Sequence, residues 1–119
     1  MLNKKYRFHS RGGVRWVYKH GKTLRCSKMS LIFAENTRGF TRLAVVVSKK
    51  VAKSAVERNR IRRRIYEALR VNFEHIPKSK DYIFVVFSKD VMKMPFGELE
   101  KILGELVEES KVCYNKKNG

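Results

Sequence analysis

The sequence predicts an α/β fold in which helices pack on a small mixed β-sheet. Two kinds of apolar pattern support this prediction: alternating or continuous apolar runs typical of strands, and apolar residues spaced by three and four, typical of helices. They occur in the order helix, strands, helix, strand, helix along 119 residues. A helix between two strands implies a crossover connection, so we expect some parallel pairing in the sheet. This length suits one domain, and we expect residues 1–119 to form it, with flexible ends at about 1–5 and 114–119.

The first part of the chain contains one predicted helix and two predicted strand regions. The helix lies between Gly13 and Gly21, because apolar side chains recur there at helical spacing and a glycine can adopt the left-handed conformation that ends a helix. Strand signals follow in residues 24–35 and 40–48. We expect these two regions to pair as an antiparallel hairpin. The second is apolar at successive positions, which is typical of a central strand covered on both faces.

A strongly basic amphipathic helix is predicted in the middle of the chain. Ser54 is its expected N-cap, with Glu57 three residues later in the pattern of a capping box. Apolar residues then recur at helical spacing to about Phe73. Residues 82–87 form the next predicted strand, and the last helix is expected to begin near Pro95, a residue favoured in the first turn.

Positive charge is concentrated in the first three-fifths of the chain. Residues 1–72 contain 20 lysines and arginines against three acids, whereas residues 73–119 contain eight lysines against eight acids. Residues 49–70 alone contain three lysines and six arginines. Because the planar guanidinium group matches phosphate oxygens at two points, this pattern favours nucleic acid as the partner. The alternative is a solvated helix face, or a nonspecific patch for polyanions or membrane surfaces.

The candidate RNA-binding residues lie in this basic helix and just before it. At about 100° per residue, Asn59, Arg60, Arg63 and Arg70 project away from the apolar stripe, Arg62 lies on its flank, and Arg58 lies near it in the first turn. The helix N-terminus also presents free N–H groups and a partial positive charge, which assist nearby lysines in holding a phosphate. The complete candidate set is Lys49, Lys50, Lys53, Arg58, Asn59, Arg60, Arg62 and Arg63.

The sequence contains no recognisable catalytic or metal-binding constellation. Paired carboxylates beside a histidine and Ser/His/Asp arrangements are missing, and the two cysteines lack CxxC or Cys/His spacing. We therefore expect no catalytic residue, no metal ligand, no bound cofactor and no small-molecule substrate. The apolar runs are far shorter than the roughly 20 residues that span a bilayer, and there is no secretory signal. We expect a cytoplasmic protein without membrane contact.

Several motifs resemble those of the protein subunit of bacterial ribonuclease P. The central ones are Ser48-Lys49-Lys50-Val51, Ala55-Val56 and Arg58-Asn59-Arg60-Ile61, followed by Arg62-Arg63 and Glu67-Ala68. Residues 14–21 resemble the first helix of that family, and residues 81–82 and 98–106 resemble parts of its C-terminal half. A basic helix alone is common, whereas Ser-Lys-Lys, a short spacer and Arg-Asn-Arg in one frame are specific.

The resemblance implies a more detailed fold. It is a small α+β sandwich, with a mixed, mainly antiparallel sheet of about four strands and three helices in the order αβββαβα. The family's sheet forms a cleft, and its crossover helix is connected in the left-handed sense, against the strong general preference for right-handed crossovers.

The resemblance also implies that the protein is not itself the catalyst. In that family a large RNA with bound Mg²⁺ removes the 5′ leader from precursor tRNA. The protein binds this RNA through the region of residues 58–60, grips the single-stranded leader and favours substrate and metal binding. The implied partners are ribonuclease P RNA and precursor tRNA, and Mg²⁺ is required by the RNA-containing holoenzyme.

A leader-binding cleft is implied between the first helix, the sheet and the basic helix. The family usually has two phenylalanines on the first helix where this chain has Val14 and Tyr18, and often a tyrosine at the position of Ile32, so we expect weaker stacking on the leader. Tyr18 suits a core position as well as a leader contact. Trp16 and Tyr66 are candidates for substitute stacking faces. The implied cleft residues are Val14, Tyr18, Ile32, Arg58, Asn59, Arg62 and Tyr66.

Two other classes of function stay open at this stage. A ribosomal or other structural RNA-binding protein would have the same charge, size and basic helix. A protein-only nuclease would cleave precursor tRNA without any RNA subunit. Cleavage assays with and without ribonuclease P RNA separate these possibilities.

Overall fold

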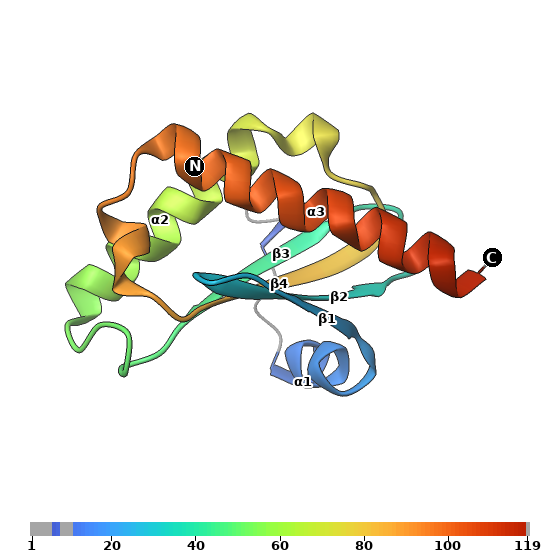
Figure 1. The fold of residues 1–119 in the computed structure, drawn as a ribbon. Coiled ribbons are helices and arrows are strands. Elements are labelled where there is room, and N and C mark those ends of the chain that lie inside the picture. Colours follow the sequence, from blue (N-terminus) through green and yellow to red (C-terminus); the bar gives the residue numbers. More distant parts are fainter. Residues whose placement is uncertain (1–5, 8–10, 119) are drawn as a thin grey trace.

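One four-stranded sheet lies between helices on its two faces (Figure 1). The structure is a computed structural model that describes residues 6–7 and 11–118. The predicted order αβββαβα is confirmed. Of the ends predicted to be flexible, residues 1–5 and 119 lie outside the described part, and the last helix continues through residues 114–118. The elements are α1 (Arg11–His20), β1 (Lys22–Arg25), β2 (Met29–Glu35), β3 (Arg42–Val47), α2 (Ala55–Val71), the 3₁₀ helix η2 (Phe73–His75), β4 (Lys80–Val86), the 3₁₀ helix η3 (Lys89–Met92) and α3 (Phe96–Asn118).

The strands are arranged in the order β1-β2-β4-β3, so the predicted hairpin is wrong. Strand β2 pairs antiparallel with β1 and with β4, and β3 pairs parallel with β4. Because β4 lies between β2 and β3, β3 is an outer strand. Its apolar run is nevertheless covered on both faces: Leu43 and Val45 contribute to the core beneath α2 and α3, whereas Ala44 and Val46 pack on the α1 side.

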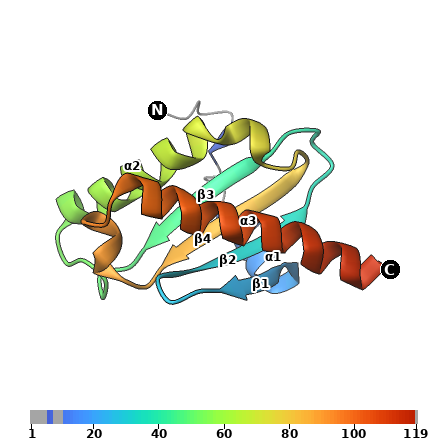
Figure 2. The same ribbon diagram turned by 45° about the horizontal axis from the view of Figure 1, so that its top comes forward.

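The connection from β3 through α2 to β4 is left-handed. Figure 2 views the sheet from the side covered by α2 and α3; both strands point to the left, and β4 lies below β3. A right-handed crossover would place β4 above β3 in this view. Since hydrophobic periodicity carries no information on this choice, only the family resemblance could predict it.

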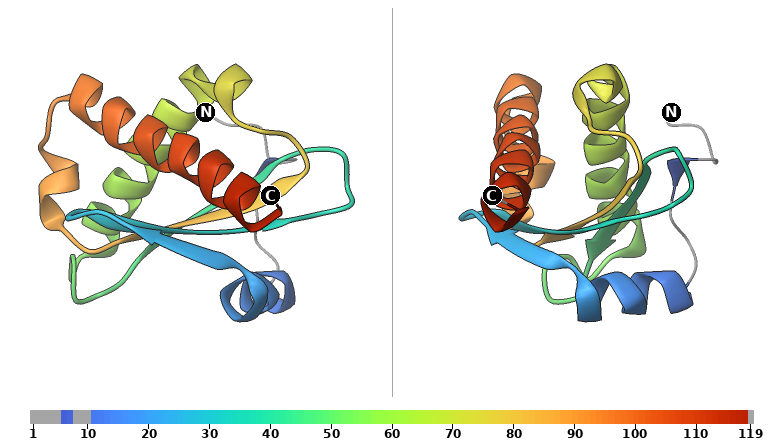
Figure 3. Two further views of the ribbon diagram at one scale, coloured as in Figure 1. Left: turned by 45° about the vertical axis from the view of Figure 1, so that its right-hand side comes forward. Right: turned by 90° about the vertical axis from the view of Figure 1, so that its right-hand side faces the viewer.

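Two unequal cores hold the layers together. Figure 3 shows α2 and α3 side by side over one face of the sheet and α1 alone over the other. The larger core joins α2 and α3 to the sheet and includes Tyr82 and Phe84 of β4, both fully buried. The smaller core consists of Val17 of α1 on Ile32, Ala44 and Ile83. Helix α1 therefore covers only part of its face of the sheet.

Candidate RNA interface

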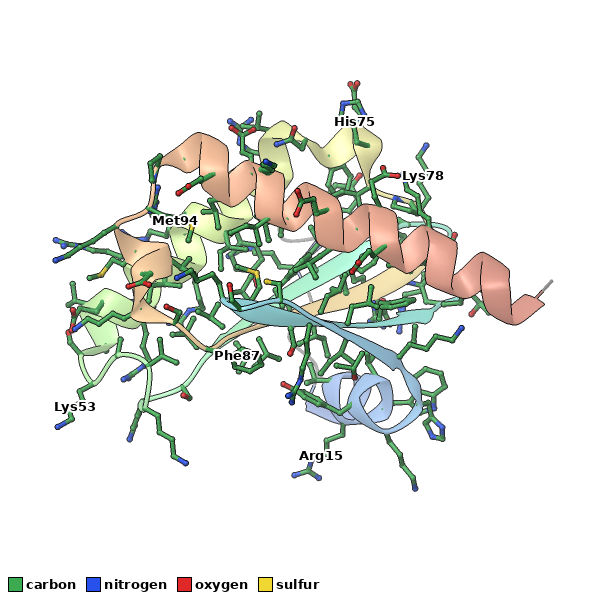
Figure 4. All side chains as sticks on the ribbon, in the orientation of Figure 1. Arg15, Lys53, His75, Lys78, Phe87 and Met94 are labelled. Atoms are coloured by element: carbon green, nitrogen blue, oxygen red, sulfur yellow. The ribbon has the colours of Figure 1, made fainter. Side chains whose placement is uncertain are left out.

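The basic helix α2 begins in a defined way at one end of the sheet. The Ser54 hydroxyl oxygen accepts hydrogen bonds from the backbone N–H groups of Val56 (3.2 Å) and Glu57 (3.4 Å), which confirms the predicted N-cap. The loop between β3 and this cap carries Lys49, Lys50 and Lys53, all exposed. Figure 4 shows the Lys53 side chain directed away from the body of the protein at this end. Three cations therefore stand beside a fixed helix N-terminus.

Arg58 fixes this loop against the helix. Its Nη1 donates hydrogen bonds to the carbonyl oxygens of Ala52 (3.0 Å) and Lys53 (2.8 Å). A guanidinium group has five N–H donors, so other donors of Arg58 can still bind a phosphate. In this structure Arg58 holds the lysine-bearing loop in place in addition to contributing charge.

Four exposed or partly exposed polar residues lie on one side of the N-terminal half of α2. Asn59, Arg60 and Arg63 are exposed, and the partly buried Arg62 donates from Nη2 to the Asn59 side-chain oxygen. Spacings of three and four residues place them on one side of the helix. We call this set, Asn59, Arg60, Arg62 and Arg63, the α2 basic face. Every member belongs to the RNA-binding set predicted from the sequence.

The other two arginines of α2 are engaged with protein atoms. Arg64, which the predicted set leaves out, donates from Nη1 to the Val91 carbonyl oxygen (2.7 Å) and from Nη2 to that of Met94 (2.6 Å). It therefore links α2 to η3 and the segment that follows. Arg70 pairs with Glu67 at 2.5 Å, and this hydrogen bond holds the pKa of Glu67 below its usual value.

The residues predicted to line the leader cleft do not all come together: Val14 and Ile32 pack in the same small core, whereas Arg58, Asn59, Arg62 and Tyr66 belong to α2, on the other face of the sheet (Figure 3). Val14, Tyr18 and Ile32 lie on the α1 side of the sheet, and Tyr66 lies in the core on the opposite side. Ile32 is 7% exposed and Tyr66 8%, so neither presents a surface to a ligand. Tyr66 was expected to be accessible, but it belongs to the part of α2 that packs against the sheet. Tyr18 is 46% exposed and keeps its candidate role.

An exposed aromatic residue that the sequence analysis missed lies on the α1 side. Phe87, directly after β4, is 45% exposed, and the guanidinium carbon of Arg25 lies 5.6 Å from its ring centroid. Figure 4 shows Phe87 on the same side of the sheet as α1. The alternation of side chains along the strand could have revealed this residue, because positions 83, 85 and 87 lie on one face of the sheet. Residues 82–87 look like a uniformly buried strand, and this hides the exposed last position.

Neither a metal centre nor a membrane span was found in the described residues. Among residues 6–7 and 11–118, no three His, Cys, Asp or Glu side chains gather where they could hold a metal ion. None of the helices described is both long and apolar enough to cross a bilayer.

Comparison with known proteins assigns nearly the whole chain to one family. The family model for ribonuclease P matches residues 2–111. This chain belongs to the ribonuclease P protein family. The ribonuclease P protein component of Clostridioides difficile is 38% identical over 101 residues, covering 82% of this chain and 85% of that protein. The ribonuclease P protein component of Syntrophus aciditrophicus is 32% identical over 106 residues, covering 89% of this chain and 87% of that protein.

Solved structures of ribonuclease P proteins share the fold. The protein from Thermotoga maritima superimposes with a TM-score of 0.79 at 26% identity, covering 87% of this chain and 96% of that chain. The protein from Staphylococcus aureus superimposes with a TM-score of 0.77 at 28% identity, covering 90% of this chain and 96% of that chain. As a ribonuclease P family member, the chain presents two distinct surfaces: the α2 basic face with its lysine loop, and the α1 side with Tyr18 and Phe87.

Proposed function

We propose that this chain is the RNA-binding component of a cytoplasmic ribonuclease P ribonucleoprotein in which the RNA subunit performs the cleavage. The observation that carries the proposal is the α2 basic face, in a chain whose family is that of ribonuclease P proteins. Exposed guanidinium groups on a rigid helix suit the phosphates of a folded RNA, because their positions are fixed before binding. The partners are ribonuclease P RNA and precursor tRNA.

The catalytic RNA would dock on the N-terminal part of α2. Lys49, Lys50 and Lys53 surround a helix N-terminus, where backbone N–H groups and the helix dipole favour an anion. The Ser54 cap and the Arg58 hydrogen bonds hold these lysines close to the α2 basic face. The two groups together would form one cationic surface for the RNA at this end of the molecule.

The 5′ leader would lie along the α1 side of the sheet. A single strand is held by cations along its backbone and by aromatic rings on which its bases stack. Tyr18 and Phe87 supply exposed rings there, and Arg25 supplies a cation beside Phe87. This arrangement replaces the predicted cleft that included Ile32 and Tyr66.

The chain would aid cleavage by bringing two polyanions together. Lysine and arginine side chains between the catalytic RNA and the leader reduce phosphate repulsion, so the complex would need less Mg²⁺ to form. Mg²⁺ itself would belong to the RNA-containing holoenzyme, and the protein alone would bind no cofactor. The protein's contribution is therefore binding and positioning.

Reconstitution tests this function. The purified protein is mixed with a bacterial ribonuclease P RNA and a precursor tRNA at low Mg²⁺, and 5′ cleavage is measured. We expect the protein to raise the cleavage rate, and to do so more for substrates with a leader of several nucleotides than for substrates with a one-nucleotide leader. RNA binding without any rise in cleavage would indicate a structural RNA-binding protein instead. Cleavage by protein stripped of all RNA would indicate a protein-only nuclease.

A further inference from the structure

A small pocket lies on the flank of α1 that faces away from Tyr18. At about 100° per residue, Trp16 and His20 lie on one side of the buried Val17, and Val14 and Tyr18 lie on the other. The pocket has a volume of about 190 Å³. We call it the Trp16 pocket; its lining residues are Trp16, His20, Lys22, Phe33, Ala34, Glu35 and Lys80.

The pocket combines a large exposed ring with an apolar floor. Trp16 is 51% exposed, and its ring centroid lies 4.7 Å from that of His20 at an interplanar angle of 38°. Phe33, which is 2% exposed and packs in the larger core, and Ala34 line the pocket where it meets the sheet. Exposed tryptophans are frequent at interaction sites because they offer a large apolar face together with one N–H donor. A flat, aromatic ligand fits this geometry.

The rim of the pocket is positively charged. Lys80 lines it, and Lys111 lies close enough to act on Lys80 electrostatically; Lys22 also lines the pocket, but its ammonium nitrogen is buried. Burial lowers the pKa of Lys80, and the charges of Lys111 and Lys22 lower it further, whereas Glu35, its cross-strand neighbour, opposes this effect. Mutual repulsion within such a cluster decreases when an anion binds. The Glu35 carboxylate can accept a hydrogen bond from an amino or imino group of the ligand.

We propose that the Trp16 pocket holds one unpaired RNA base, stacked on Trp16, with the adjoining phosphate beside Lys80. A volume of about 190 Å³ is below the roughly 300–1,000 Å³ of typical drug-sized ligand sites, so it suits a single base. The inference rests on the proposed function for the presence of RNA. Stacking on Trp16 would be a second aromatic contact of α1 with RNA, on the flank opposite Tyr18. The base comes either from the 5′ leader or from an unpaired region of ribonuclease P RNA.

Trp16 is the single tryptophan of the chain, so its fluorescence reports on this pocket alone. The wild-type protein is titrated with a single-stranded leader oligonucleotide and, separately, with ribonuclease P RNA, and quenching of Trp16 by acrylamide is measured. We expect one of the two RNAs to shield Trp16 and thereby identify the source of the base. Saturated binding of both RNAs with Trp16 still fully accessible would overturn the proposal.

Paired substitutions test the energetic role of the pocket. We expect Trp16→Ala to weaken binding of the RNA that shields Trp16 by about tenfold, and Trp16→Phe to retain most of the affinity because it keeps a stacking face. Lys80→Ala should also weaken binding of that RNA, whereas Lys101→Ala, at an exposed lysine of α3 across the sheet, should have a smaller effect. Equal affinities of Trp16→Ala and wild type would refute the stacking role.

Two controls keep this test separate from the proposed function. Circular dichroism checks that each variant unfolds at the wild-type temperature. Cleavage by reconstituted wild-type holoenzyme checks the proposed function itself. If the wild-type protein stimulates cleavage while the Trp16 results are negative, only the pocket assignment fails. If the wild-type protein gives no stimulation, the proposed function fails.

Discussion

Neighbouring arginines of α2 have different surroundings and therefore different expected roles. Arg63 is exposed on the α2 basic face, whereas the guanidinium group of Arg64 is occupied by two backbone carbonyl oxygens from the segment after β4. The sequence shows only three successive arginines, 62–64. Helical rotation separates Arg63 from the apolar stripe, but no periodicity predicts that η3 and the segment after it would offer carbonyl groups to Arg64.

The difference between Arg63 and Arg64 can be measured. We expect Arg63→Ala to lower RNA affinity and to reduce the salt dependence of binding by about one phosphate contact, with stability changed by less than about 0.5 kcal/mol. Arg64→Ala should lower the free energy of unfolding by about 1–3 kcal/mol, because two carbonyl groups lose their donor. Denaturant unfolding and RNA titration of both variants provide the measurements. If the two variants gave the same pattern, this division of roles would be wrong.

Phe87 offers a test of the leader path on the α1 side. We expect Phe87→Ala to weaken binding of precursor tRNA with a leader by about 1–3 kcal/mol, the range for loss of one base–aromatic stack, and to leave binding of mature tRNA nearly unchanged. Phe87→Leu should resemble Phe87→Ala if stacking is responsible. Val71→Ala removes an exposed apolar side chain at the far end of α2 and serves as control. Equal losses of affinity for precursor tRNA and for mature tRNA would place Phe87 outside the leader site.

Helix α2 depends on its first turn for both stability and binding. Ser54 satisfies two N–H groups at the helix start and so defines where the lysine loop ends. We expect Ser54→Ala to cost about 1 kcal/mol in the free energy of unfolding. Ser54→Asp should keep the cap and the stability but weaken RNA binding, because it adds a negative charge beside Lys53. Unfolding and RNA titration distinguish the two effects; unaltered RNA affinity in Ser54→Asp would remove the α2 N-terminus from the interface.

Sequence patterns predicted where the helices and strands lie better than they predicted which strands pair with each other. Helical spacing located α1, α2 and α3, and the cap of α2, because these features depend on residues close in sequence. The position of β3 depends on β4, some 40 residues later, so a turn between two strand regions was mistaken for a hairpin connection. The same limit applies to the site: charge and helix spacing identified the α2 basic face, whereas the burial of Tyr66 and the exposure of Phe87 follow from layer packing.

Charge is unevenly distributed over the whole molecule. Residues 1–72 carry the entire excess of 17 positive charges, and residues 73–119, which include α3, are balanced. Helix α3 covers the sheet beside α2, so a helix from the balanced part lies in the same layer as the basic helix (Figure 3). This asymmetry would orient the protein as it approaches a polyanion.

The salt dependence of RNA binding tests this distribution. If about six phosphates are neutralised, affinity should fall by about a thousandfold between 50 and 200 mM salt, because each contact releases condensed counterions. Filter binding or fluorescence titration at several salt concentrations gives the slope. A flat response would contradict the electrostatic account of the interface.

The position of β4 also constrains how the chain acquires its structure during synthesis. Among the four strands of the described sheet β3 pairs only with β4, and β4 also pairs with the whole of β2; outside these strands, Leu43 of β3 forms a single bridge with Arg7. Until residues 80–86 have left the ribosome, three strands are present without the one that joins them, and two strand edges lack their partner. Exposed strand edges favour aggregation, and we expect the dense positive charge of the first 72 residues to oppose it by repulsion between chains.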